Sequence, residues 1–394
     1  MKVTVAIDSF KGSLSTFEAG SAAKDGIKKV FPEAEVIISP LADGGEGTVD
    51  AVVSANNGEY ITATVTGPLG EKVDAKYGII PERKLAVMEM SAAAGITMVP
   101  EEKRNPLDTT TYGVGEMIKD ALDRGMRNFL IGIGGSATND GGLGMLSALG
   151  FEFTTKNGEK VSPFGRGLSE IYDVSNDKAD LRLSECNFQI ACDVKNPLCG
   201  DMGCSRIYGP QKGATEEIIK DMDKWLNSFS DLTKKINPDS DKNYPGAGAA
   251  GGLGFAFMSY LGGELKSGIE LVMNETDLEE KIKDSDFVIT GEGRLDGQSG
   301  MGKAPIGVAK LAKKYNIPVI AFAGAVTDDA ECLNDLGIDA FFSILKKPCA
   351  LSEAMDRVNA SDNLKRTAKQ VSNLIKSFLF MCGTIISQSE INEK

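Results

Sequence analysis

Five glycine-rich loops in this 394-residue chain carry polar residues that can do chemistry. The first reads "DSFKGS", where Asp8, Ser9 and Lys11 follow an apolar, β-branched run. A carboxylate can hold Mg²⁺ or orient a hydroxyl, and a lysine can neutralise a phosphate or a carboxylate. Turns and helix caps use the same residue types, so an ordinary capping loop is the alternative interpretation.

The second loop, "ADGGEGT", places Asp43 and Glu46 among three glycines. Glycine accepts backbone torsions that other residues avoid, so such a loop can fold its carboxylates around a cation or a substrate hydroxyl. Asp43 and Glu46 are therefore candidate Mg²⁺ ligands. A plain strand-to-helix turn is the alternative.

The third loop, "FLIGIGGSATNDGGLG", satisfies the dinucleotide fingerprint through Gly132-x-Gly134-x-x-Ala137. That fingerprint also requires an acidic residue about 20 positions on, at the end of the next strand. Glu152 has the right separation but lies inside the predicted strand "FEFTT". Dinucleotide binding is therefore the weaker interpretation of this loop.

Consecutive backbone amides between glycines can instead form an anion-binding nest, and a following helix N-terminus strengthens it. In this interpretation the polar residues of the loop bind phosphate or substrate, and they are Ser136, Asn139 and Asp140. The remaining alternative is a tight turn without a ligand.

The fourth candidate combines "ACDVKNPL" and "GPQKGA", which supply Asp193 and Lys212 for metal and phosphate. The fifth, "ITGEGRLDGQSGMGKAP", matches seven positions of the P-loop pattern and then has Ala304 in place of the Mg²⁺-binding hydroxyl. The candidate ligands of this loop are Arg294, Asp296, Gly300, Gly302 and Lys303. An exposed charged loop is the alternative.

The chain contains no histidine. A histidine-dependent triad, a Cys2His2 zinc site and a histidine general base are therefore excluded, and Asp, Glu, Lys, Tyr or Cys must carry any acid–base chemistry. Phosphoryl transfer suits this inventory, because it needs positioning, cations, Mg²⁺-binding carboxylates and one Asp that receives a hydroxyl proton.

The net charge of −13, with no basic run, disfavours nucleic acid and anionic membranes as partners. No stretch approaches the ~18 consecutive apolar residues of a membrane helix, and the N-terminus reads as a strand rather than a secretory signal. We therefore expect a cytoplasmic protein. Seven scattered cysteines without a CxxC pair predict reduced thiols.

The elements that must position these loops alternate between strand and helix at both ends of the chain, which predicts a doubly wound parallel sheet. Ser15 and Glu18 predict a capping box at the first helix. Between the ends, "YITATVT" and "EKVDAKYGII" read as an antiparallel hairpin, and 215–235 reads as an amphipathic helix.

We therefore predict an α/β protein of two domains. Residues 1–60 together with 285–394 form a doubly wound, flavodoxin-like parallel-sheet domain, and residues 61–284 form an inserted mixed α/β domain. Ligands of open parallel sheets bind beyond the carboxyl ends of the strands, where the five loops fall.

Nine motifs taken in order resemble the bacterial type I glycerate kinases over about residues 1–345. They are "DSFKGS", "PLADGGEGT", "VTGPLG", "TTTYGVGEMI", "IGIGGSATNDGG", "ACDVKNPLCG", "GPQKGA", "PGAGAAGGLG" and "ITGEGRLDGQSGMGKAP". The resemblance implies two α/β domains with the active site in the cleft between them. It also implies ATP-dependent phosphorylation of D-glycerate, with 2-phosphoglycerate favoured over 3-phosphoglycerate as the product.

Under this hypothesis, loops 132–144 and 297–303 cradle phosphates, and Lys11, Lys303 or Arg294 neutralises the transferred group. Either Asp193 or Asp296 accepts the hydroxyl proton. Asp43, Glu46 or the remaining Asp helps hold Mg²⁺, while Asp8 and Ser9 contact substrate.

ATP and Mg²⁺ are the expected cofactors, and a homodimer is the expected assembly. An NAD(P)-dependent hydroxy-acid oxidoreductase is the alternative function, and a non-catalytic small-molecule sensor is a third.

Overall fold

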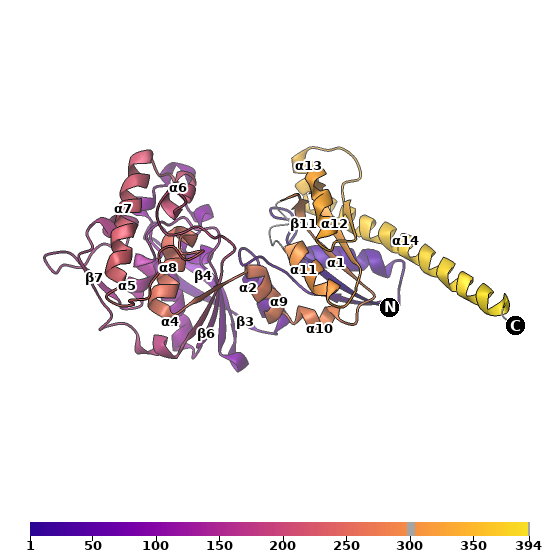
Figure 1. Cartoon of the computed structure of the whole chain (residues 1–394), viewed down its shortest axis with the longest axis horizontal. Helices are drawn as coiled ribbons and strands as arrows, with labels where there is room; N and C mark the ends of the chain where they lie inside the picture. The colour runs from indigo at the N-terminus through magenta and orange to yellow at the C-terminus, as the bar shows by residue number, and fades with distance from the viewer. Residues whose placement is uncertain (298–303, 393–394) are drawn as a thin grey trace. The chain divides into compact units, whose positions relative to one another are not determined.

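The computed structural model describes residues 1–297 and 304–392, with side chains described as far as Leu379 (Figure 1). The chain divides into two compact units. Unit 1 contains residues 1–42 and 273–394, and unit 2 contains residues 43–272. Among the described residues, no helix is both long and apolar enough to span a bilayer.

Unit 1 is built on a five-stranded, fully parallel sheet with the order β13-β12-β11-β1-β2. Its strands are β1 (Lys2–Ile7), β2 (Glu35–Ile38), β11 (Phe287–Leu295), β12 (Val319–Val326) and β13 (Ala340–Ser343). Numbered within the unit, this order is 2-1-3-4-5, which is the flavodoxin-like order. The predicted doubly wound sheet formed by both ends of the chain is confirmed.

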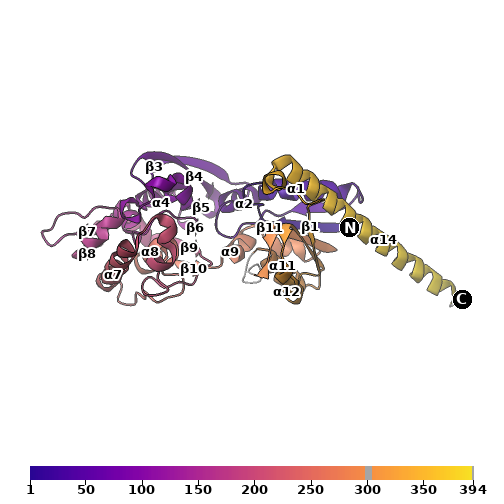
Figure 2. The ribbon, with the colours of Figure 1, turned by 90° about the horizontal axis from the view of Figure 1, so that it is seen from above.

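The helices of unit 1 include α1 (Thr16–Lys28), α10 (Leu278–Ile282), α11 (Ala304–Lys313), α12 (Cys332–Asp335), α13 (Leu351–Met355) and α14 (Arg357–Asn392). The predicted capping box is present at α1, where the Ser15 side chain accepts from the Glu18 amide and Glu18 accepts from the Ser15 amide. Helices α1 and α14 lie side by side (Figures 1 and 2). Gly26 permits this approach, because a β-carbon there would come 2.4 Å from the Lys365 carbonyl oxygen.

Unit 2 is built on a six-stranded mixed sheet with the order β10-β9-β6-β5-β4-β3. Its strands are β3 (Glu59–Thr66), β4 (Lys72–Ile80), β5 (Leu85–Glu89), β6 (Asn128–Gly132), β9 (Asn187–Ala191) and β10 (Glu264–Lys266). The predicted hairpin is confirmed as the antiparallel pair β3–β4, whereas β5, β6, β9 and β10 run parallel. Strands β7 (Glu152–Thr154) and β8 (Asp173–Ser175) form a separate antiparallel pair.

The helices of unit 2 are α2 (Thr48–Ala55), α3 (Ser91–Ala94), α4 (Tyr112–Asp123), α5 (Leu143–Ala148), α6 (Cys204–Tyr208), α7 (Glu216–Thr233) and α8 (Ala249–Leu261). Helix α9 (Gly268–Glu275) crosses from unit 2 into unit 1. Aromatic side chains on β6, β9, α7 and α8 pack into one core, which contains Phe129, Phe188, Phe229 and Phe257.

The expected boundaries were 60/61 and 284/285, and the units change over at 42/43 and 272/273. The first difference arises because α2 packs on strands of the second sheet. A β-carbon at Gly78 of β4 would come 2.1 Å from Val53 of α2, so this helix is seated closely on that sheet. The division into independently folding domains stays a prediction.

Two elements near the C-terminus differ from expectation. The strand expected to end near Thr290 continues as β11 to Leu295, since Arg294 and Leu295 still pair with β12. The helix expected over 327–336 is a 3₁₀ turn followed by the four-residue α12.

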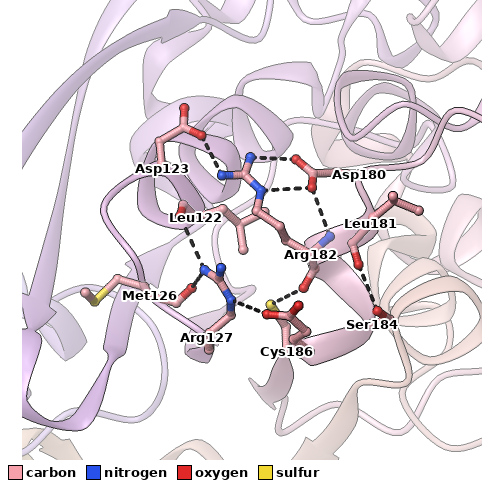
Figure 3. Close-up of polar contacts among 10 residues, drawn as sticks. Leu122, Asp123, Met126, Arg127, Asp180, Leu181, Arg182, Ser184 and Cys186 are labelled. Atoms are coloured by element: carbon pink, nitrogen blue, oxygen red, sulfur yellow. Dashed lines mark hydrogen bonds and ion pairs between the residues drawn. The ribbon is translucent and has the colours of Figure 1, made fainter.

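An ion-pair network clamps the amino-terminal ends of β6 and β9 (Figure 3). The Arg182 guanidinium donates to both carboxylate oxygens of Asp180, at 2.9 and 2.7 Å, and to Asp123 at the end of α4, at 2.7 Å. Arg127 donates to Glu185 at 3.0 Å. Arg182 holds Asp180 through two hydrogen bonds at once. We therefore expect this network to stabilise the fold more than a single exposed ion pair does.

We expect Arg182→Ala to lower the free energy of unfolding by about 1–2 kcal/mol, because it removes a bidentate contact and leaves Asp180 without that partner. Thermal denaturation should show a lower Tm with unchanged catalytic activity. Arg206→Ala, which removes a single pair with the exposed Asp201 at 3.7 Å, is the control and should leave Tm unchanged. An equal fall in Tm for both variants would contradict this account.

Candidate active site

Unit 1 places several candidate residues at the point where its strand order reverses. Strands β1 and β11 are neighbours in the middle of the sheet. Strand β2 lies on the outer side of β1, whereas β12 and β13 lie on the outer side of β11. Ligands of open parallel sheets bind at the carboxyl ends of the strands at such a switch point. Asp8, Ser9 and Lys11 follow β1, and Arg294 and Asp296 lie at the end of β11.

These side chains differ in burial. Asp8 is 4% exposed and accepts from the Ser9 amide at 2.6 Å. Arg294 Nε lies 3.3 Å from Asp296, whose carboxylate is mostly buried. Lys11 is exposed. The predicted residues Gly300, Gly302 and Lys303 lie outside the described residues.

In unit 2 the loop 43–47 crosses the carboxyl ends of β6 and β9 at van der Waals distance. A β-carbon at Gly132, the last residue of β6, would come 2.1 Å from the Gly44 carbonyl oxygen. At Gly44, which has φ +84°, it would come 2.5 Å from Ala191 of β9. At Gly268 it would come 2.1 Å from the Asp43 carbonyl oxygen. Only glycines allow this approach.

The crossing brings Asp43 next to Asp193. Asp193 follows β9, and its Oδ1 accepts from the Gly268 amide at 3.1 Å. Burial raises the pKa of the Asp193 carboxyl, and the nearby carboxylates of Asp43 and Glu270 raise it further, against the lowering effect of its hydrogen bonds. A carboxylate with a raised pKa is suited to accept a proton.

Sequence reasoning missed Glu89, the last residue of β5. Its Oε1 accepts from the amides of Gly47 and Val49, at 3.1 and 3.0 Å, so it caps the start of α2. Burial raises the pKa of Glu89, and the carboxylates of Asp50 and Glu46 act in the same direction. Glu89 thus joins the acidic edge formed by Asp43, Glu46 and Asp193.

No group of three or more Asp, Glu or Cys within the described ranges is arranged to hold a metal ion. Mg²⁺ in phosphoryl-transfer sites usually takes only one or two protein carboxylates, and substrate phosphates and water complete its shell. Asp43 can supply one such carboxylate. Mg²⁺ ligation by Asp43 and Glu46 stays a prediction.

In the glycine-rich loop 132–144, the backbone amides at the start of α5 donate to a buried side chain of the loop itself. Asp140 is fully buried and accepts from the Thr111 amide and hydroxyl, at 2.8 and 2.7 Å, and from the amides of Gly142 and Gly144, at 3.1 and 3.2 Å. Burial still raises the pKa of Asp140. Because Asp140 occupies the amides at the start of α5, the geometry does not favour a pyrophosphate at this helix. A ligand contact for Asp140 stays a prediction.

The buried side-chain amine of Lys212 is bound to the same loop. Lys212 is 2% exposed, and its Nζ donates to Ser136 Oγ at 2.8 Å and to the Thr138 carbonyl oxygen at 2.6 Å. Burial lowers the pKa of Lys212 to about 8. Asn139 donates to Ser205 Oγ at 2.8 Å, and its Oδ1 is buried without a hydrogen-bond partner among the described residues. The structure thus brings Ser136, Asn139 and Lys212 into one polar cluster.

Comparisons with known proteins agree with this architecture. A family model described as the glycerate kinase family matches residues 3–376. "Glycerate 2-kinase" of Escherichia coli (strain K12) is 50% identical over 372 residues, which cover 94% of this chain and 97% of that protein. "Glycerate kinase" of Bacillus subtilis (strain 168) is 46% identical, covering 95% and 98%.

A crystal structure assigned as glycerate kinase 2 of Salmonella typhimurium LT2 is similar to the whole chain. It superposes with a TM-score of 0.88 at 44% identity, and the match covers 96% of this chain and 99% of that one.

The buried Lys212 amine should make stability depend on pH. Its pKa is about 8 in the folded protein and about 10.5 when unfolded, so between these values the unfolded chain binds more protons. Lys212 therefore makes the folded state more stable as pH rises through this window. In Lys212→Met this contribution disappears, so the difference in unfolding free energy between wild type and variant should change by up to about 3 kcal/mol from pH 8 to 10.5.

Denaturant unfolding of both proteins across that range measures the effect. Taking the difference cancels cysteines and tyrosines that titrate in the same window. Lys220→Met, on α7 and exposed to solvent, is the control and should show no such change. A pH-independent difference for Lys212→Met would contradict the assignment.

Proposed function

Since the chain belongs to the glycerate kinase family, we propose that it is a glycerate 2-kinase, which transfers the terminal phosphoryl group of ATP to the 2-hydroxyl of D-glycerate. The observation that carries this proposal is the 50% identity with a protein named glycerate 2-kinase along 94% of the chain. The residues at the carboxyl ends of the parallel strands in each unit also support it, because they include the carboxylates and cations that phosphoryl transfer uses.

Asp193 is the residue we assign as the general base. Its pKa is raised by burial and by neighbouring carboxylates, so it can take the proton of the glycerate hydroxyl as that oxygen attacks phosphorus. Asp296, the other candidate, is in an ion pair with Arg294, which makes it the weaker choice.

The cations Lys11 and Arg294 belong to the switch point of unit 1 and would neutralise the phosphates of ATP. Asp43, with Glu46, would hold Mg²⁺, which supplies further charge neutralisation when bound. Asp8 and Ser9 would contact substrate at the same edge as Lys11. Lys212 holds Ser136 in place from the protein interior, so Ser136 is the better candidate for direct contact.

The activity and the position of transfer can be tested in one assay. We expect ADP release with D-glycerate, and little with glycerol, hydroxypyruvate or tartronate. If the 2-hydroxyl is phosphorylated, enolase alone should convert the product to phosphoenolpyruvate, with no mutase added. ADP release without phosphoenolpyruvate until a mutase is present would assign the 3-hydroxyl, and no ADP release with D-glycerate would overturn the proposal.

We expect Asp193→Asn to lower kcat by about 10²–10⁴-fold with a small change in KM, because the amide cannot accept the proton. Because its pKa is raised, wild-type kcat/KM should fall on the acid side with a midpoint above the ordinary aspartate value of about 3.9. Steady-state kinetics against pH measures both effects. Asp201→Asn, at an almost fully exposed side chain of the same unit, is the control.

A larger loss of kcat in Asp296→Asn than in Asp193→Asn would transfer the role of base to Asp296 and contradict this assignment. Near wild-type turnover in both variants would reject the mechanism altogether.

A further inference from the structure

We propose that Arg104 of unit 2 binds the carboxylate of the substrate, with the Ser136 hydroxyl as a second donor. In this role Arg104 determines the preference for a hydroxy acid over an uncharged polyol. The inference deepens the proposed function and rests on it. Arg104 directly follows the 3₁₀ turn Glu101–Lys103 and was not a candidate from sequence.

The Arg104 guanidinium lacks the partner that a partly buried arginine normally has. Its Nε is buried without a hydrogen bond, and no ion pair joins the guanidinium to any residue that the structure describes. The other two partly buried arginines of the described chain, Arg127 and Arg182, both pair with carboxylates (Figure 3). A buried donor without an acceptor is costly, because its lost contacts with water are not replaced. Arg104 therefore indicates an acceptor that comes from outside the chain.

The acidic residues close to Arg104 in sequence do not neutralise it. Glu101 and Glu102, on the preceding turn, form no ion pair within the described part of the chain. Asp108, four residues on, pairs with Arg166 instead. The positive charge of Arg104 is thus left for a ligand.

The segment that carries Arg104 is fixed to the glycine-rich loop 132–144 on both sides of this residue. Before it, the Ile96 amide donates to the Gly135 carbonyl oxygen at 2.8 Å. After it, the Thr111 amide donates to the Asp140 carboxylate at 2.8 Å. The segment therefore packs on the loop that follows β6, at the edge where parallel strands bind their ligands.

A second contact brings the backbone of Arg104 close to the residues that hold Ser136. Gly213 has φ +88°, and a β-carbon there would come 1.9 Å from the Arg104 carbonyl oxygen and 3.0 Å from the Arg104 β-carbon. The preceding residue, Lys212, donates from Nζ to Ser136 Oγ at 2.8 Å. Lys212 thus connects the backbone beside Arg104 to the Ser136 hydroxyl.

The Ser136 hydroxyl can donate to the same ligand as Arg104. Its oxygen accepts from Lys212, and its O–H makes no hydrogen bond with the residues described. Ser136 is 8% exposed, whereas Lys212 is 2% exposed and donates from the interior. A planar guanidinium binds a carboxylate through two parallel hydrogen bonds, and a hydroxyl adds one more donor. This donor set matches a carboxylate.

The charge of the surrounding chain makes such a cation necessary. The net charge is −13, and Asp43, Glu46 and Asp193 lie near the carboxyl ends of the unit 2 strands. These carboxylates repel a substrate whose own carboxyl group is ionised at neutral pH, unless a cation compensates for them. The Lys212 amine is enclosed in the interior, so Arg104 is the better group for direct contact.

Calorimetric titration with D-glycerate and its uncharged amide D-glyceramide, with and without a non-hydrolysable ATP analogue, tests the proposal. We expect Arg104→Met to weaken D-glycerate binding and to raise its KM by about 10- to 100-fold, because charge-assisted hydrogen bonds are lost. D-Glyceramide affinity and the KM for ATP should change less than about twofold. Arg104→Lys, which keeps the charge but not the fork, should lie between wild type and Arg104→Met. Because Nε has no partner, Tm should not fall in Arg104→Met.

The control is Arg206→Met, at an exposed arginine of α6, which should change D-glycerate affinity less than about twofold. Equal losses of affinity for D-glycerate and D-glyceramide in Arg104→Met would overturn the proposal. A larger loss of D-glycerate affinity in Lys195→Met, at an exposed lysine after β9, would also overturn it.

The same measurements separate this site from the proposed reaction. Arg104-dependent binding of D-glycerate without ADP release would reject the kinase function and keep the site. Phosphorylation of D-glycerate with the wild-type KM in Arg104→Met would keep the function and reject the site. Wild-type protein that neither binds nor phosphorylates D-glycerate would reject both.

Discussion

The close passage of loop 43–47 over the ends of β6 and β9 is the constraint on which the unit 2 site depends. Three glycines make it possible, since side chains at 44, 132 or 268 would collide with backbone or with Ala191. This contact sets Asp43 beside Asp193 and lets Glu89 reach the amides at the start of α2. A glycine requirement at a strand end is thus the physical origin of the acidic edge.

A second backbone contact holds the neighbouring loop. Gly251 and Gly252 have positive φ and interrupt the start of α8, and a β-carbon at Gly251 would come 2.2 Å from the Thr138 carbonyl oxygen. The Gly141 amide donates to the Gly251 carbonyl oxygen at 2.9 Å. The small residues of "PGAGAAGGLG" therefore allow one loop to pack on another. This packing encloses Asp140 and the Lys212 amine in the interior.

Local signals in the sequence predicted much of the fold. The capping box at α1 depends on two residues three positions apart, and the β3–β4 hairpin on alternation beside a short turn. Glu89 could not be found this way, because it ends an apolar strand and its partners lie about 40 residues earlier. The burial of Asp140 was equally hidden, since a polar residue between glycines reads as an exposed loop.

The same limit explains the differences in unit 1 and at the unit boundary. Whether β11 ends at 290 or 295 depends on its pairing with β12, which the charged residues of "EGRL" do not reveal. The seating of α2 on β4 depends on Gly78, a residue that is unremarkable as sequence. Wherever a long-range contact decides the structure, residue types alone leave several outcomes open.

Because the chain contains no histidine, a carboxylate of the acidic edge is the natural candidate for the general base. A carboxylate surrounded by water is too weak a base at neutral pH, and a protein without imidazole must strengthen one by burial and by neighbouring negative charge. Asp193 has both influences, through its burial and through Asp43 and Glu270. These carboxylates repel one another until a cation or a proton arrives, so the edge favours a substrate that brings a divalent cation and supplies a proton. A metal–nucleotide complex together with a hydroxy acid meets both conditions, which connects the packing of glycines at strand ends to the proposed reaction.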